Sequence, residues 1–204
     1  MRQSGARRSL PLRYRHAVEA VVLGASAGGV DALLQVLSGL PASYGVPLIV
    51  ALHLRHDRNS LLVDVFASRT ALRVREAADK EPMTPGTLYI APPGYHLLLE
   101  ADRSFSLSCD PPEHFSRPSI DVLLESAADA LGPRLAAVLL TGANHDGAAG
   151  MAEVGRLGGL TVIQDPDEAQ FPEMPRAALA LRVPDFVLPL QQIQAFLAGL
   201  HPLP

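Results

Sequence analysis

The sequence of 204 residues contains no tryptophan and a single cysteine, Cys109. One cysteine excludes an internal disulfide framework, and no spacing of Cys and His resembles a zinc site. No apolar run approaches the roughly 20 residues that a helix needs to cross a bilayer, so we expect no membrane insertion. Residues 1–16 also lack the apolar core of a signal peptide. We therefore expect a cytoplasmic protein without a metal ion or another cofactor.

Charge is distributed unevenly along the chain. Residues 1–16 carry five arginines and no acid, whereas 12 basic residues face 21 acidic ones in the rest, which leaves a charge of about −9 there. An acidic body argues against a nucleic-acid-binding domain. We expect a basic, flexible arm over residues 1–16 and a single domain over 17–204. Whether the arm touches nucleic acid or an acidic partner, or is a frayed leader, a linker remnant or the product of a misassigned start, stays open.

From Glu19 onward, short β-branched runs alternate with stretches of helical periodicity. The run PLIVAL (47–52) is apolar throughout, which is typical of a strand that is buried on both faces. The alternation predicts an α/β fold with a doubly wound, mostly parallel sheet and helices on both faces. Short runs on either side of Pro92, Pro93 and Gly94 predict a small antiparallel hairpin set beside the main sheet.

The expected boundaries follow from turn residues and periodicity. The expected strands span 19–23, 47–52, 134–140, 159–164 and 186–188, with 87–91, 96–100 and 104–108 in the antiparallel set. The expected helices span 30–40, 60–69, 118–131, 146–157, 174–181 and 190–200.

Ser26 is the first candidate for chemistry. Ligands bind beyond the carboxyl ends of the strands in such a sheet, and Ser26 lies in the strand-to-helix turn GASAGG (24–29). Its hydroxyl would be exposed beside free backbone N–H groups, and the helix N-terminus would favour an oxyanion there. Two other interpretations stay open: Ser26 caps the helix, or the turn cradles a nucleotide phosphate. The segment matches neither G-x-G-x-x-G nor the P-loop nor G-x-S-x-G.

His53 directly follows the PLIVAL strand and would lie close to Ser26. Imidazole is suited to take and return a proton near neutral pH. A nucleotide-binding domain would instead need an acidic residue at this strand end. The alternative for His53 is a histidine bound by backbone carbonyls at the sheet edge. His56 is a weaker candidate, because it lies in the loop beyond.

Asp146 completes the set. It lies in the glycine-flanked loop LTGANHDGAAG (140–150), after another buried strand, and a carboxylate there could orient an imidazole. An ordinary N-cap for the next helix is the alternative. The adjacent His145 is expected to point elsewhere. Ser26, His53 and Asp146 together predict a catalytic triad and a serine esterase.

At these residues the sequence resembles the catalytic domain of the chemotaxis protein-glutamate methylesterases, the CheB family, from about Ala17 to Leu200. GASAGGV resembles the nucleophile turn of the family, LHL its histidine strand end and LTGANHDGAAGM its aspartate loop. Further similar stretches are APPGYHLLL (91–99), FSRPSIDVLLESAA (115–128) and QDPDEAQFPEMPRAAL (164–179).

The resemblance implies hydrolysis of glutamate γ-methyl esters on the cytoplasmic helices of methyl-accepting chemoreceptors, with release of methanol. It implies Ser26 as nucleophile, His53 as general base and Asp146 as its orienter. Some family members deamidate receptor glutamines, so a deamidase with the same triad is an alternative, as is a non-catalytic receptor-binding module.

The remaining candidate residues are expected to contact the substrate. We expect backbone N–H groups near Ala27 and Gly28, and at Ala143, to form the oxyanion site. Arg117 is expected either to approach the substrate or to form a buried ion pair with Asp121 or another acid.

Three features depart from the family pattern. Ala27 stands where many members have Thr, and Ala143 and Asn144 stand where many have Met-Gly. No receiver domain precedes Ala17 in this sequence. We therefore expect an esterase that is constitutive, is regulated by a separate receiver or kinase protein, or serves a receptor-like system outside chemotaxis.

Overall fold

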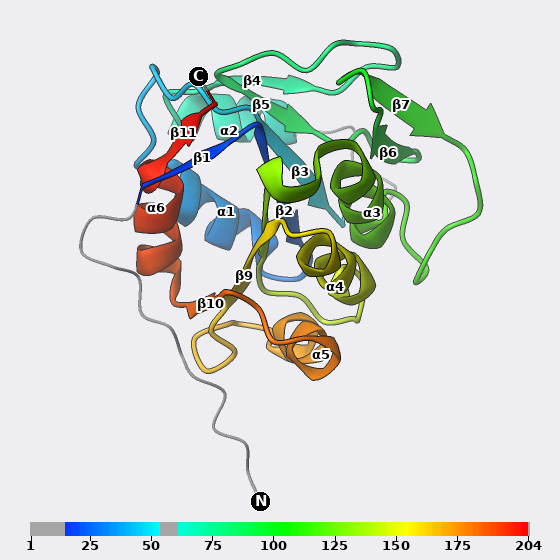
Figure 1. The fold of residues 1–204 in the computed structure, drawn as a ribbon, viewed down its shortest axis with the longest axis vertical. Coiled ribbons are helices and arrows are strands. Elements are labelled where there is room, and N and C mark those ends of the chain that lie inside the picture. The colour runs from blue at the N-terminus through cyan, green and yellow to red at the C-terminus, as the bar shows by residue number, and fades with distance from the viewer. Residues whose placement is uncertain (1–14, 54–60, 204) are drawn as a thin grey trace, which may run out of the picture.

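The computed structural model describes residues 15–53 and 61–203 (Figure 1). Seven strands form one parallel sheet in the order β10-β9-β8-β2-β3-β5-β4. This confirms the doubly wound parallel fold. The strands are β2 Ala20–Ala25, β3 Leu48–Leu52, β4 Arg73–Glu76, β5 Thr87–Ile90, β8 Leu135–Leu139, β9 Leu160–Gln164 and β10 Phe186–Leu188.

Six α-helices of the described residues cover the two faces of the sheet (Figure 1). Alternate residues of β2 explain this arrangement: Val21 and Leu23 pack into one buried cluster, and Val22 packs into the other. The first cluster contains residues of α1 Gly29–Leu37, α2 Leu62–Arg69 and α6 Leu190–Gly199. The second contains residues of α3 Ile120–Leu131, α4 Ala148–Arg156 and α5 Glu173–Leu181.

The antiparallel hairpin consists of β6 His96–Leu99 and β7 Phe105–Ser108, as predicted. The assignment of residues 87–91 to that set was wrong, because β5 lies in the main sheet, parallel to β3 and β4. A four-residue strand next to a proline turn carries too little pattern to distinguish the two placements. The edge strand β4 was not predicted, since three of its four residues are exposed and it lacks an apolar run.

The two ends of the described chain lie together. β1 His16–Val18 pairs in parallel with β11 Leu200–Pro202, and neither strand was predicted. Residues 1–14 of the predicted arm lie outside the described residues, as does His56. A 3-10 turn, Gly132–Arg134, leads into β8.

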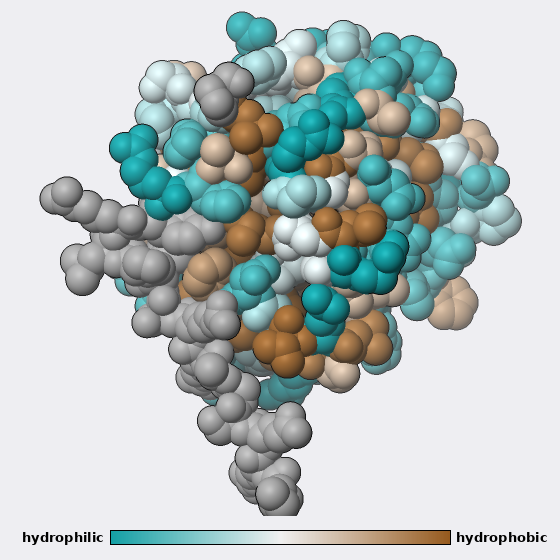
Figure 2. Space-filling view, viewed as in Figure 1, coloured by the Kyte–Doolittle hydropathy of each residue, from teal (hydrophilic) through white to brown (hydrophobic). Residues whose placement is uncertain are grey.

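The surface shown in Figure 2 mixes hydrophilic and hydrophobic residues. Hydrophobic residues gather over α5, whose last residue, Leu181, is exposed. No helix in the ranges that the structure describes is both long and apolar enough to cross a membrane.

Candidate active site

Ser26 and His53 leave the sheet side by side because they follow two neighbouring strands that are in register. Ala25, the last residue of β2, pairs with Leu52, the last residue of β3, and His53 N–H donates to the Ala25 carbonyl at 3.3 Å. The Ser26 hydroxyl consequently lies 3.2 Å from Nδ1 of His53. Adjacent parallel strands thus bring a nucleophile and a base together across 27 positions of sequence.

The turn after Ser26 explains why its hydroxyl is not used in capping. Helix α1 begins at Gly29, its N-cap is Gly28, and no side chain caps it, so the helix-cap interpretation of Ser26 was wrong. Gly28 has φ +73°, and a Cβ there would lie 2.5 Å from Oε1 of Gln170. The positive φ therefore favours glycine at this position, and any larger residue would also displace the end of the Gln170 side chain.

A cleft of about 290 Å³ lies over Ser26 and His53. Its lining residues are Ser26, Gly28, Gly29, Val30, Asp31, Leu52, His53 and Gln170. Within the described parts of the chain, the N–H groups of Ala27 and Gly28 meet no protein acceptor. These donors lie at the N-terminus of α1, where the helix dipole favours negative charge.

The loop after β8 passes beside Ser26, because Ser26 N–H donates to the Thr141 carbonyl at 3.0 Å. In this loop the Gly142 N–H is occupied by the Phe171 carbonyl, whereas Ala143 is exposed. The oxyanion role of Ala143 stays a prediction.

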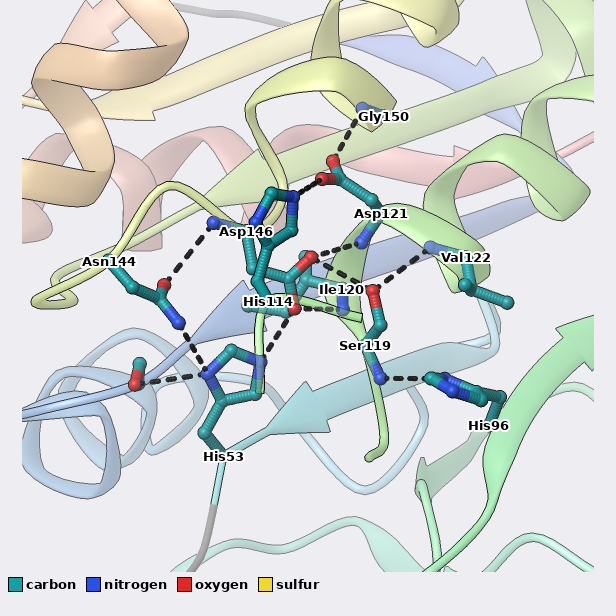
Figure 3. A network of polar contacts seen from close by, with 11 residues as sticks. His53, His96, His114, Ser119, Ile120, Asp121, Val122, Asn144, Asp146 and Gly150 are labelled. Atoms are coloured by element: carbon teal, nitrogen blue, oxygen red, sulfur yellow. Dashed lines mark hydrogen bonds and ion pairs between the residues drawn. The ribbon is translucent and has the colours of Figure 1, made fainter. Parts of the chain in front are cut away.

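Asp146 is fully buried and lies at the N-terminus of α3 (Figure 3). Its carboxylate accepts hydrogen bonds from Ile120 N–H at 2.7 Å, Asp121 N–H at 2.9 Å and the hydroxyl of Ser119, the α3 N-cap, at 2.9 Å. Helix α4 is capped by Gly147 instead and starts at Ala148, so the N-cap interpretation of Asp146 was wrong. The aspartate binds the start of a helix that precedes it in sequence.

The same carboxylate faces His53, whose Nε2 lies 2.7 Å from Oδ2 of Asp146. Burial opposes ionisation of Asp146, but the bonds from His53, Ile120 and Asp121 outweigh it and hold the pKa of Asp146 below its usual value. The ionised carboxylate therefore accepts the Nε2–H of His53, which leaves the lone pair of Nδ1 facing the Ser26 hydroxyl. This arrangement can remove a proton from Ser26 and stabilise the resulting imidazolium.

A second carboxylate, Asp121, lies behind Asp146. The pKa of Asp121 is raised to about 6, mainly by burial. The negative charge of Asp146 raises this pKa further, whereas a hydrogen bond of 2.7 Å from Gly150 N–H lowers it. His114 Nε2 approaches Asp121 at 3.4 Å. In the described ranges, His114, Asp121 and Asp146 are the only group of at least three potential metal ligands whose ligand atoms converge, within 4.8 Å of one another. Both carboxylates already accept backbone hydrogen bonds.

Arg117 does not pair with Asp121, so that part of the prediction was wrong. Its guanidinium donates to the carbonyl oxygens of Cys109 at 2.8 Å and Asp110 at 2.9 Å, while His114 approaches Asp121. Arg117 is not among the residues that line the cleft over Ser26. A contact between Arg117 and the substrate stays a prediction.

Three polar residues of the site had no predicted role. Ser119 holds Asp146, and buried His96 accepts from Ser119 N–H through Nδ1 at 3.2 Å, with its Nε2 on the Pro111 carbonyl at 3.0 Å. Asn144 bridges Asp146 and His53. Ser119 carries a sequence signal, since a serine directly before a helix marks an N-cap and hence an anion-binding helix start. His96 and Asn144 carry none.

Comparisons with known proteins agree with one another. The CheB methylesterase family profile matches residues 21–197. A putative protein-glutamate methylesterase/protein-glutamine glutaminase of Leptospira interrogans is 41% identical over 175 residues, which is 86% of this chain and 91% of the relative. The protein-glutamate methylesterase FrzG of Myxococcus xanthus is 40% identical, over 87% of this chain and 53% of the relative. The crystal structure of the Thermotoga maritima CheB methylesterase catalytic domain superposes with a TM-score of 0.85 and 31% identity, covering 90% of this chain and 98% of that domain.

Proposed function

This chain belongs to the CheB methylesterase family, and we propose that it is a protein-glutamate methylesterase in which Ser26, His53 and Asp146 form the catalytic triad. One observation carries the proposal: the hydrogen-bonded series from Ser26 Oγ through His53 to buried Asp146 opens onto a cleft. A serine, an imidazole and an ionised carboxylate in this order are the parts that ester hydrolysis requires.

In the first half of the reaction, Ser26 Oγ attacks the γ-carbonyl carbon of a methylated glutamate while its proton passes to Nδ1 of His53. Asp146 stabilises the imidazolium through the 2.7 Å contact with Nε2. The negative oxygen of the tetrahedral intermediate accepts from the N–H groups of Ala27 and Gly28. Collapse breaks the carbon–methoxy bond, His53 returns its proton to the leaving oxygen, and methanol departs.

In the second half, water attacks the glutamyl ester on Ser26. His53 takes the water proton and then protonates Ser26 Oγ as the acyl bond breaks, which frees the glutamate side chain and restores the site. The open cleft over Ser26 admits this water.

Hydrolysis of glutamine side chains is the second candidate, because the name of the Leptospira relative includes a protein-glutamine glutaminase. An amide passes through the same acyl-enzyme, with ammonia as the leaving group in place of methanol. The two activities therefore share all residues named above and differ only in the leaving group.

The proposed substrate is the cytoplasmic part of methyl-accepting chemoreceptors, which implies action in the cytoplasm. A separate receiver or kinase protein is the proposed regulator. A basic arm over residues 1–16 and a methylesterase domain over 17–204 remain the proposed division of the chain.

The test measures methanol from methylated chemoreceptor cytoplasmic fragments and ammonia from fragments with glutamine at the same sites. Methanol release by the wild type, lost in Ser26→Ala, is the expected result. Ammonia release alone would replace the esterase by the deamidase. Neither product from correctly folded protein, with and without a phosphorylated receiver protein, would favour the non-catalytic receptor-binding module.

A further inference from the structure

The side chain of Asn144 connects the two catalytic partners of Ser26 (Figure 3). Its Oδ1 accepts from Asp146 N–H at 3.3 Å, and its Nδ2 lies 3.4 Å from Nδ1 of His53. The Asp146 N–H determines the orientation of this amide. If the amide were turned over, its NH₂ group would face the Asp146 N–H, donor against donor. The NH₂ group therefore points at His53.

Two donors consequently approach one acceptor atom. The Nε2–H of His53 is committed to Asp146, so Nδ1 of the neutral ring offers a single lone pair. The Ser26 hydroxyl lies 3.2 Å from Nδ1 and the Asn144 amide 3.4 Å from it. A hydrogen bond donated to the lone pair favours the neutral ring. Once the ring is protonated, Nδ1 carries a hydrogen, and the Asn144 amide faces another donor.

We propose that Asn144 is a positioning residue for the hydrolysis, whose side-chain amide holds Nδ1 of His53 toward Ser26 and favours the neutral imidazole that accepts the serine proton. This inference rests on the proposed function of Ser26 and His53. Its consequence is that removal of the amide changes how the rate of serine attack depends on pH.

Other ionisable groups around His53 are also expected to affect the pH dependence. Asp146 contacts the ring directly, Asp31 of α1 lines the same cleft, and Asp121 lies behind Asp146 with His114. Asp121 has a pKa raised to about 6, mainly by burial, so it titrates in the same range as an ordinary histidine. Asp121→Asn in the wild-type and Asn144-variant backgrounds separates its contribution from that of Asn144.

The experiment compares Asn144→Asp and Asn144→Ala with the wild type in two pH profiles. One profile is kcat/KM for methanol release. The other is the rate at which a fluorophosphonate labels Ser26, a step in which the Oγ–P bond forms, fluoride leaves and the serine proton passes to His53. The labelling profile needs no receptor substrate. Thermal unfolding midpoints show that the variants fold, and Asn144→Asp is almost isosteric.

Both variants are expected to move the acidic limb of both profiles to higher pH. Asn144→Asp replaces a donor by a negative charge that stabilises the imidazolium, so its limb moves by about one pH unit or more. Asn144→Ala only removes the donor, and its limb moves in the same direction by a fraction of a unit. In Asn144→Ala, which adds no charge, a merely structural role would lower the rates without moving the limb.

A limb of Asn144→Ala that coincides with the wild type in both profiles, or a limb that moves to lower pH in either variant, would overturn the role of Asn144. If the wild type labels at Ser26 but releases neither methanol nor ammonia, the proposed function fails, and the labelling profiles still decide on Asn144. A wild type that does not label at Ser26 at any pH overturns both.

Discussion

The two ends of the triad are built differently. Asp146 is fully buried and receives four hydrogen bonds, from His53, Ser119, Ile120 and Asp121. Ser26 faces a cleft, with the N–H groups of Ala27 and Gly28 beside it. His53 lies between the two ends, with 10% of its side chain exposed.

The contrast separates two requirements of catalysis. The orientation of His53 depends on Asp146, and the N-terminus of α3 holds Asp146 through groups that no substrate reaches. The Ser26 end has to admit a substrate and water, so its donors stay open. We therefore expect loss of a polar side chain at the Asp146 end to affect both stability and rate, and loss of the Ser26 hydroxyl to affect mainly the rate.

Ser26→Ala and Asp146→Asn give the largest expected effects and test the contrast directly. Ser26→Ala should lower kcat by about 10⁴–10⁶, and Asp146→Asn by about 10⁴. Ser26→Ala should change the free energy of unfolding by less than about 1 kcal/mol. Asp146→Asn should lose roughly 2–4 kcal/mol, because its NH₂ group would face donors at the α3 N-terminus. Methanol release and urea unfolding measure both; an Asp146→Asn variant as stable as the wild type would contradict the contrast.

Gly28→Ala tests whether the turn after Ser26 contributes to the rate. Gly28 has φ +73°, which strains any residue with a side chain, and an added methyl group would meet the end of Gln170, so either the Gln170 side chain or the turn that carries the open N–H groups has to move. We expect kcat to fall roughly ten- to a hundredfold.

Gly94→Ala is the matched control, since Gly94 has φ +82° but an added methyl group meets nothing within 4 Å. Both variants should lose about 1–2 kcal/mol of unfolding free energy for the backbone conformation. Equal activity losses in the two variants would show that the Gly28 turn has no special role.

Ser119→Ala tests whether the N-terminus of α3, by holding Asp146, keeps His53 in the orientation that catalysis needs. The substitution removes the hydroxyl bond to Asp146 and the cap bond that Val122 N–H donates to Ser119 Oγ. We expect a loss of about 1–2 kcal/mol in stability and a roughly tenfold lower kcat with an unchanged KM. Ser38→Ala, which removes an exposed hydroxyl bond to Gln35 after α1, is the control and should leave kcat unchanged. An unchanged kcat in Ser119→Ala would show that the Ser119 hydroxyl does not help to orient His53.

Asp121→Asn is expected to change mainly how stability depends on pH. The folded protein raises the pKa of Asp121 from 3.8 to about 6, mainly through burial. The contribution of this group to stability is therefore present below pH 3.8 and lost as the pH rises through 6. Between pH 4 and 7 the wild type should lose about 1–3 kcal/mol relative to the variant. Urea unfolding across this range measures it, and a constant difference would rule out the shift.

The sequence predicted the sheet and its strand ends well, for a physical reason. β2, β3 and β8 are apolar because both faces of the sheet are covered, so the end of each apolar run can be recognised in the sequence. The carboxyl ends of neighbouring parallel strands lie at the same edge of the sheet. Ser26, His53 and Asp146 were singled out in this way, and the structure brings their side chains together.

What the sequence could not show depends on contacts across layers. Nothing local indicates that the start of α3 meets an aspartate about 25 residues further along. β4 was missed because an exposed edge strand of charged residues has no apolar pattern. The direction of the Asn144 side chain follows from the fold of its loop, which residue types alone do not determine.

In the proposed mechanism, Ser26 carries the glutamyl group during turnover. Acid quenching of the wild type mixed with methylated chemoreceptor fragment, followed by peptide mass mapping, tests it most directly. We expect a peptide containing Ser26 joined through Oγ to a receptor glutamate, and we expect this peptide to be absent from Ser26→Ala. Methanol release at the wild-type rate by Ser26→Ala, or a glutamyl adduct on another residue, would contradict it.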